Sequence, residues 1–218
     1  TALGWFPRGC GITGQNLEEG DVLIGLPSSG VHSNGYTLVR AVIERSGCSL
    51  EDPCPFDPSH HSREIERFSG VGSRPTLAEV LLNPTRIYVD PVVDLVLESR
   101  GEEGIVGPES IKAIAHITGG GLSNLLRLHD RVGWHIDSPL EPQPEFEWIS
   151  EIGSVAPLEM HRTFNMGMGM VIAVSEDSAE VAEEWISSRL PGSRRVGRVV
   201  DNGRLVTHSE EDVVFSHY

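Results

Sequence analysis

A short polar segment between an apolar run and an amphipathic stretch constrains the fold of this chain more than any other feature. The run 22–26 reads VLIGL, the segment 28–35 reads SSGVHSNG, and residues 36–43 follow with apolar side chains at helical spacing. This order predicts a strand, a loop and an amphipathic helix whose first turn is capped by Ser33 or Asn34. Free backbone N–H groups and the positive end of the helix dipole would face the loop, which suits an anionic ligand. An ordinary capped turn uses the same residue types, so the pattern alone leaves both interpretations open.

A second loop of the same kind lies later in the chain. Residues 111–118 alternate and include β-branched side chains, which predicts a strand, and residues 122–128 follow as a predicted helix. Between them, Gly119, Gly120 and Gly121 carry no Cβ, so their backbone amides can approach a ligand oxygen closely. The nucleotide P-loop ends in Gly-Lys-Ser/Thr and the dinucleotide fingerprint has spaced glycines, so neither motif is present. A bare run of glycines is also common in flexible turns.

A third polar segment, 162–170, reads RTFNMGMGM and leads into an apolar strand. Gly167 and Gly169 alternate, so one face of the segment carries no side chain, which allows a bulge or a close neighbour. Asn165 and Arg162 can reach a carbonyl or phosphate group. The methionines of the segment are interpreted as core filler.

The remaining elements indicate a mixed α/β layer. The predicted helices are 76–82 with a capping box, 90–101 with Asp90-Pro91 at its start, 144–152, and 177–190 with Val181, Trp185 and Ile186 as its apolar face; the predicted strands are 133–137 and a hairpin of 196–200 with 205–207.

Four motifs, in order and spacing, resemble the C-terminal half of aminoimidazole ribonucleotide synthetase, also called phosphoribosylformylglycinamidine cyclo-ligase. The motifs are residues 20–35, 81–88, 115–121 and 159–169, and the resemblance extends from about residue 20 to residue 200. It implies an α/β (α+β) fold in which helices flank a mixed β-sheet. Related synthetases of the same architecture lack the His-Ser-Asn-Gly loop, which makes the resemblance specific.

The resemblance also implies that this chain is one part of a longer enzyme. Residues 1–19 are expected to be a linker left from a missing N-terminal ATP-binding domain, because the acidic loop of that domain does not occur here and position 1 is not Met. Residues 20–218 are expected to form the substrate-binding C-terminal domain. Within it, the stretch 51–72 is rich in Pro, Ser and charge and is expected to be a mobile loop.

The activity implied by the resemblance is the ATP-dependent conversion of formylglycinamidine ribonucleotide to aminoimidazole ribonucleotide, with this half inactive alone. ATP and Mg²⁺ would be bound mainly by the missing half, and the intact enzyme would be a homodimer. Two alternatives stay open: a non-catalytic nucleotide-binding or regulatory module of the same fold, and a sibling ATP-dependent synthetase with another substrate. The His-Ser-Asn-Gly loop weighs against the sibling.

Matching by position assigns roles to individual residues. His32 and His116 are expected to handle protons or orient the substrate, since a histidine titrates near neutrality. The residues expected to bind the substrate or its phosphate are Ser28, Ser29, Gly30, Ser33, Asn34, Thr118, Gly119, Gly120, Gly121, Arg162 and Asn165.

The net charge, the hydropathy and the cysteine positions of the chain indicate which kinds of ligand and environment to expect. The chain of 218 residues has a net charge of −15, which argues against a nucleic-acid ligand. No apolar run approaches the roughly 20 residues that span a bilayer, and a cytoplasmic protein is expected. Cys10, Cys48 and Cys54 are odd in number and lack the spacing of a metal site, so they are interpreted as free thiols.

No metal site is expected from the histidine positions. His60 and His61 lie in the predicted mobile loop without a second pair at ligand spacing. His161 flanks the third polar segment at a position where the family pattern varies. The others, His208 among them, stand alone and are interpreted as solvated surface residues.

Overall fold

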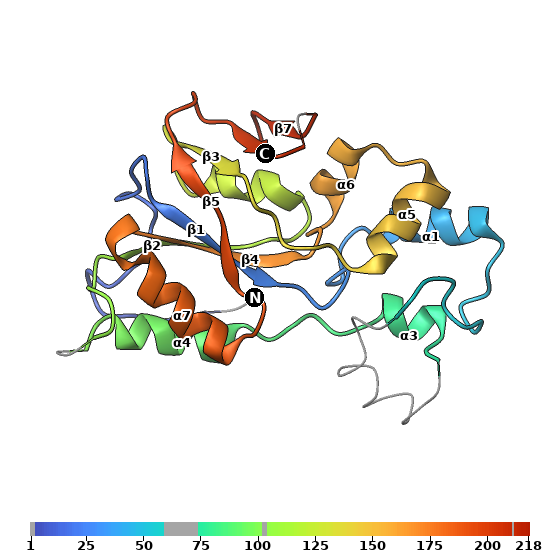
Figure 1. Ribbon diagram of the computed structural model, residues 1–218, viewed down its shortest axis with the longest axis horizontal. Helices are drawn as coiled ribbons and strands as arrows, with labels where there is room; N and C mark the ends of the chain where they lie inside the picture. Colours follow the sequence, from blue (N-terminus) through green and yellow to red (C-terminus); the bar gives the residue numbers. More distant parts are fainter. Residues whose placement is uncertain (1–2, 59–73, 102–103, 211) are drawn as a thin grey trace.

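A mixed β-sheet forms the centre of the chain in the computed structural model, which describes residues 3–58, 74–101, 104–210 and 212–218 (Figure 1). Within these residues the sheet has seven strands in the order β2-β4-β1-β5-β3-β6-β7. The strands are β1 Val22–Pro27, β2 Ile111–His116, β3 Gly133–Ile136, β4 Met168–Val174, β5 Arg194–Val200, β6 Val206–His208 and β7 Val214–Phe215. Neighbouring strands run antiparallel except β3 and β6, which are parallel. The predicted fold class is therefore confirmed.

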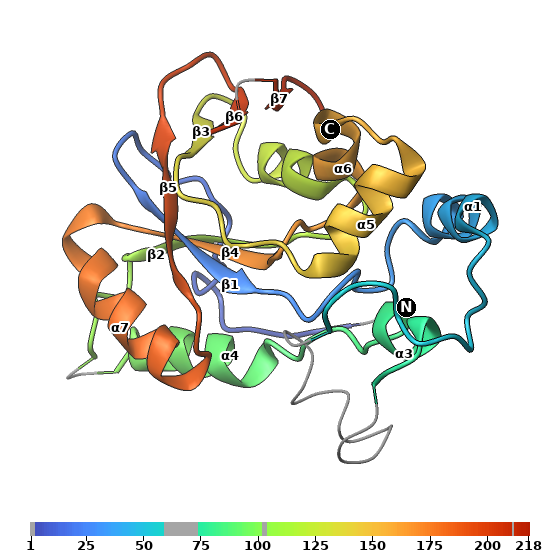
Figure 2. The same ribbon diagram turned by 45° about the vertical axis from the view of Figure 1, so that its right-hand side comes forward.

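Helices pack on both faces and at one end of this sheet. They are α1 Tyr36–Ser46, α3 Leu77–Leu81, α4 Val89–Glu98, α5 Pro144–Gly153, α6 Pro157–Thr163 and α7 Ala179–Arg189, with the 3₁₀ helices η2 Gly121–Arg127 and η3 Glu176–Ser178. The helices α4 and α7 lie together on one face, while α1, α3 and α5 gather beyond the end of β1 (Figure 2). No helix in the described part of the chain is long and apolar enough to cross a membrane.

The alternation of side chains along β1 divides the core between the two faces of the sheet. Val22, Ile24 and Leu26 pack with α4 and α7, while Leu23 packs on the opposite face against η2. A third apolar cluster joins α1, α3, α5 and α6 around Val31 of the loop after β1. The loop is therefore anchored in a core of its own.

Several predicted elements form as expected. The strand and helix on either side of the first polar segment are confirmed, as are β2, β3, α5 and the capping box of α3, in which Thr76 and Glu79 bond each other's backbone amides. All three cysteines are free. Residues 59–72 of the predicted mobile loop, with His60 and His61, lie outside the described residues.

The helix predicted over residues 122–128 forms as the 3₁₀ helix η2. Three local predictions are wrong. The expected hairpin does not pair, because β3 lies between β5 and β6 in the sheet. The helix α4 begins at Val89 with Tyr88 at its N-cap, not at Asp90. In α7, Ala182 is buried whereas Val181 is 44% exposed.

Candidate active site

The three polar segments meet at one edge of the sheet. In the antiparallel ladders, Pro27 at the end of β1 pairs with Met168 at the start of β4, and His116 at the end of β2 pairs with Met170. The chain therefore leaves β1 and β2, and enters β4, at the same edge. We call residues 28–35, 117–121 and 164–167 the first, second and third loops.

The backbone of the first loop is held in the left-handed region. His32 has φ 51° and Ser33 has φ 60°, an unusual conformation for residues with a side chain. The expected cap of α1 is not formed: Gly35, with φ 70°, occupies the N-cap position and no side chain bonds the first turn. Such a conformation persists only where surrounding contacts hold it.

His32 supplies the main contacts within the first loop. Its side chain is 4% exposed, and its Nε2 lies 2.9 Å from the backbone N of Ser29 and 3.0 Å from the Ser29 Oγ. A backbone N–H can only donate, so Nε2 is unprotonated and the neutral ring carries its proton on Nδ1. This Nδ1 is buried without a hydrogen-bond partner. The Ser29 hydroxyl donates to the carbonyl of Pro84 at 2.8 Å, which ties the loop to the segment before α4.

The surroundings of His32 keep its ring neutral. Burial lowers its pKa from 6.5 to about 4, and the positive charges of His116, when that ring is protonated, and of Arg86 act in the same direction. His116 differs, because it is exposed at the end of β2. Partial desolvation nevertheless lowers the pKa of His116 below its ordinary value, so this ring is also neutral at physiological pH.

Tyr88 lies between the two histidines. Its ring centroid is 6.1 Å from that of His32 and 5.9 Å from that of His116, with edge-to-face geometry at both contacts. Its hydroxyl donates to the carbonyl of Pro27 at 2.9 Å. A Cβ on Gly169 would lie 2.0 Å from the Tyr88 Oη and 2.8 Å from the His32 Cε1. The predicted close neighbour of this glycine is therefore confirmed.

Asn34 joins the first loop to the second. Its Oδ1 accepts the backbone N–H of Gly119 at 2.9 Å, and its Nδ2 donates to the carbonyl of His32 at 2.9 Å. Both ends of the carboxamide are thus occupied, which explains why Asn34 does not cap α1.

The second loop turns tightly against α6. The Gly121 N–H donates to the Thr118 carbonyl at 2.8 Å, and the Asn124 Nδ2 donates to the Gly121 carbonyl at 2.6 Å. Gly120 has φ 104° and Gly121 has φ 53°. Thr118 is half-buried, with its hydroxyl 3.3 Å from the Asn124 Oδ1. Two of the three glycine amides, those of Gly119 and Gly121, are therefore already used within the protein.

The third loop is hydrogen-bonded to the first loop through Asn165. Asn165 is buried, donates from Nδ2 to the carbonyl of Gly30 at 2.7 Å, and accepts the Gly167 N–H at 3.0 Å. Arg162 lies instead in the last turn of α6, where it is exposed and its guanidinium lies 5.8 Å from the ring centroid of Phe215. The structure thus brings Asn165, but not Arg162, to the first loop.

Ser28 is also occupied within the protein. Its hydroxyl donates to the Gln143 Oε1 at 2.8 Å, and the Gln143 Nε2 donates back to the Ser28 carbonyl at 3.0 Å. Among the predicted site residues, Ser33 and His116 are the ones whose side chains are exposed at the meeting point of the loops. The buried residues fix the conformation of the loops, whereas the side chains of Ser33 and His116 are accessible to a ligand.

The sequence interpretation missed four residues that organise the site: Asn83, Tyr88, Asn124 and Gln143. The Asn83 Nδ2 donates to the Ser29 carbonyl at 2.6 Å. Asn83 and Tyr88 lie in the motif 81–88 that supports the family resemblance, so a signal was present. Gln143 has none, because its partner Ser28 lies 115 residues away.

Acidification is expected to weaken the fold through His32. Its folded-state pKa of about 4 lies below its ordinary 6.5, so between these values the unfolded chain binds more protons and the unfolding free energy falls as the pH falls. Above pH 6.5 both states are neutral and the contribution is constant. The full shift corresponds to about 3 kcal/mol. Urea unfolding of the wild type and His32→Gln at pH 7 and pH 4.5 should show a smaller acid-induced loss in the variant; equal losses would contradict this role.

The sheet, with three polar loops interlocked at one edge, defines the chain as an α/β domain with a candidate ligand site at its strand ends. The family model described as "AIR synthase related protein, C-terminal domain" matches residues 18–209, and the chain belongs to this family.

Curated relatives agree with this assignment. Proteins named phosphoribosylformylglycinamidine cyclo-ligase are 40% identical over 203 residues in Methanosarcina mazei, 42% identical over 199 residues in Methanopyrus kandleri, and 44% identical over 181 residues in Vigna unguiculata. These matches cover 93%, 91% and 82% of this chain, but 51%, 49% and 40% of the relatives. The chain thus spans about half the length of the curated relatives it matches.

Solved structures share the fold at low sequence identity. HypE of E. coli, a hydrogenase maturation protein, matches with a TM-score of 0.50 and 18% identity, over 93% of this chain and 51% of that one. HypE in complex with ATP matches with a TM-score of 0.50 and 16% identity, over 93% and 51% of the two chains. At such identity the likeness is one of fold.

Proposed function

We propose that this chain is the C-terminal half of an ATP-dependent phosphoribosylformylglycinamidine cyclo-ligase of purine biosynthesis. The observation that carries the proposal is the identity of 40% to 42% with cyclo-ligases over more than nine-tenths of the chain, including all three loops. The family membership and the interlocking of the loops at one sheet edge support it.

The reaction proposed for the complete enzyme is a ring closure. ATP supplies a phosphoryl group to the formyl oxygen of formylglycinamidine ribonucleotide, which turns a poor leaving group into a phosphate ester. The amidine nitrogen then forms a bond to the formyl carbon, the carbon–oxygen bond breaks, and the oxygen leaves as inorganic phosphate. The products are aminoimidazole ribonucleotide, ADP, phosphate and a proton, which leaves a nitrogen. This chemistry needs a proton acceptor and groups that hold the phosphorylated substrate.

We infer that His116 handles the proton and that His32 positions the loop. His116 is exposed and neutral, so its lone pair is accessible to a substrate. The His32 Nε2 is already occupied by Ser29, and burial holds its pKa at about 4. The role in proton transfer expected for both histidines is therefore assigned to His116.

Binding of the substrate is assigned to the outward-facing groups of the loops. The Ser33 hydroxyl, the half-buried Thr118 hydroxyl and the backbone of Gly120 are the groups best placed to meet a phosphate or an amidine. Ser28, Ser29, Asn34 and Asn165 shape the loops through their internal hydrogen bonds, and Gly30, Gly119 and Gly121 do so through their backbones.

The residues of the three loops lack the ligands that a magnesium ion needs. Mg²⁺ in proteins is bound through carboxylate oxygens, and none of the three loops contains Asp or Glu. We therefore assign Mg²⁺ and most of the ATP site to an amino-terminal domain of the kind that makes up the other half of the relatives. The expected homodimer and the cytoplasmic location stay predictions, and the Vigna unguiculata relative is named chloroplastic/mitochondrial.

Calorimetric titration of this chain with formylglycinamidine ribonucleotide, followed by ATP, tests the assignment of the two sites. Binding of the substrate without binding of ATP is the expected result. If the substrate of a sibling synthetase, such as thiamine phosphate, binds more tightly than formylglycinamidine ribonucleotide in the same calorimetric experiment, the alternative of a different synthetase is favoured. Substrate binding by this chain, with no turnover once an amino-terminal half is added, would favour a regulatory module.

A further inference from the structure

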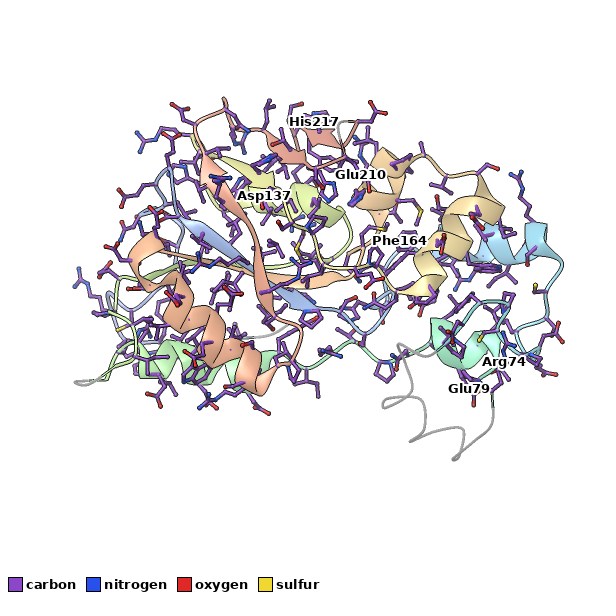
Figure 3. All side chains as sticks on the ribbon, in the orientation of Figure 1. Arg74, Glu79, Asp137, Phe164, Glu210 and His217 are labelled. Atoms are coloured by element: carbon purple, nitrogen blue, oxygen red, sulfur yellow. The ribbon has the colours of Figure 1, made fainter. Side chains whose placement is uncertain are left out.

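Two buried histidines and a glutamate meet between α6 and the segment after β6, and none of the three belongs to the residues assigned to the candidate active site. His161 lies in the last turn of α6, His208 ends β6, and Glu210 follows two residues later. The ring centroids of the two histidines are 4.5 Å apart, and the His161 Nε2 lies 3.7 Å from the Glu210 Oε2. Glu210 lies beside α6 (Figure 3). The interpretation of His208 as a solvated surface residue is wrong, since it is 7% exposed.

We propose that His161, His208 and Glu210 bind one divalent transition-metal ion of the zinc type. One ligand atom from each residue lies within 4.8 Å of the others. In a tetrahedral zinc site with bonds of about 2.0–2.1 Å, neighbouring ligand atoms are about 3.4 Å apart. Closing the site therefore requires the ligand atoms to approach one another by up to about 1.4 Å.

The donor atoms suit zinc and not magnesium. Two imidazole nitrogens and one carboxylate oxygen form a set that binds Zn²⁺, whereas Mg²⁺ takes oxygen ligands. Both histidines are buried, and a neutral imidazole ring offers a nitrogen lone pair to an ion. The His161 Nδ1 is buried without a hydrogen-bond partner. The His208 Nδ1 accepts the Glu210 N–H at 3.1 Å, and ligation by His208 would rearrange this hydrogen bond.

The surroundings leave room for a fourth ligand. His161 and Glu210 line a cavity of about 450 Å³ that also reaches Gln143 and Met160. Three protein ligands and a water complete a tetrahedral zinc site. An ion here would link α6 to β6, and the second loop packs against the His161 carbonyl, so the ion would also brace that loop.

Zinc binding by the tag-free chain, stripped with EDTA and with its thiols alkylated, tests this site. Equilibrium dialysis against Zn²⁺ is expected to give one ion per chain, with a rise in the thermal unfolding temperature that EDTA reverses. Glu210→Gln is expected to weaken binding more than about tenfold, because loss of even an indirect partner of a metal site has an effect of that size. His217→Ala, which changes an exposed histidine outside the cluster, is the matched control and should bind like the wild type.

Folding of the variants is separable from binding. The Glu210 side chain is 55% exposed, so Glu210→Gln should unfold like the wild type when no metal is present. His161→Gln provides the second variant, compared at equal folded fraction. Failure of the wild-type chain to bind zinc at micromolar concentration would overturn the proposal. So would equal zinc affinity in the wild type, Glu210→Gln and His161→Gln.

Discussion

In an enzyme completed with an amino-terminal half, His116→Ala is expected to reduce kcat by about a hundredfold or more. The reason is that His116 is the exposed, neutral histidine at the meeting point of the loops, and a general acid or base contributes roughly 10²–10⁴-fold to a rate. The measurement is formation of aminoimidazole ribonucleotide at saturating substrate, across a range of pH. The acidic limb of the wild-type pH profile should disappear in the variant.

His129→Asn serves as the control for this substitution. His129 accepts the backbone N–H groups of Arg131 and Val132 beyond the end of η2, and asparagine retains an acceptor there. Its rate should equal that of the wild type. A rate for His116→Ala within a few-fold of the wild type, in a protein of unchanged stability, would remove His116 from the chemistry.

Gly121→Ala is expected to destabilise the chain by about 3 kcal/mol, through a backbone clash and a left-handed φ. A Cβ at this position would lie 1.9 Å from the His161 carbonyl oxygen, and φ is 53°. The obstructing atom belongs to the backbone of α6, so no side-chain rotation relieves the contact. Urea unfolding of the variant should show a lower midpoint with an unchanged slope.

Gly119→Ala is the matched control in the same loop. Its Cβ would lie 3.6 Å from the Asn34 Oδ1, an ordinary contact, and its φ is outside the left-handed region. The control should stay within about 0.5 kcal/mol of the wild type, as expected for a substitution without a clash. Equal midpoints for the two variants would contradict the close approach of the second loop to α6.

Local patterns predicted the strands and helices that carry the loops. The alternation in 111–116 and the apolar run 22–26 form β2 and β1, and the capping box places α3. The pairing of β6 with β3 could not be predicted, because the turn at 201–203 indicates a local hairpin and nothing in the two strands shows that β3 inserts between them. Long-range strand order depends on packing that a local pattern does not encode.

Residue types predicted where the site lies better than what each residue does. Asn34 has the side chain of a helix cap, yet it bonds Gly119, a residue 85 positions away. His32 and His116 look alike in sequence, and only burial separates them. The cluster of His161 and His208 was missed because the two residues are distant in sequence and meet only when β6 packs beside α6.

The most direct test joins this chain to the amino-terminal half of the Methanosarcina mazei relative and measures the products formed from formylglycinamidine ribonucleotide and ATP. The intact relative is the positive control, and a cooperative unfolding transition verifies that the chimera is folded. The expected result is formation of aminoimidazole ribonucleotide with one ADP per product, abolished by omission of either half. A folded chimera that binds ATP and formylglycinamidine ribonucleotide but forms no product would contradict the assignment of this chain as the C-terminal half of a cyclo-ligase.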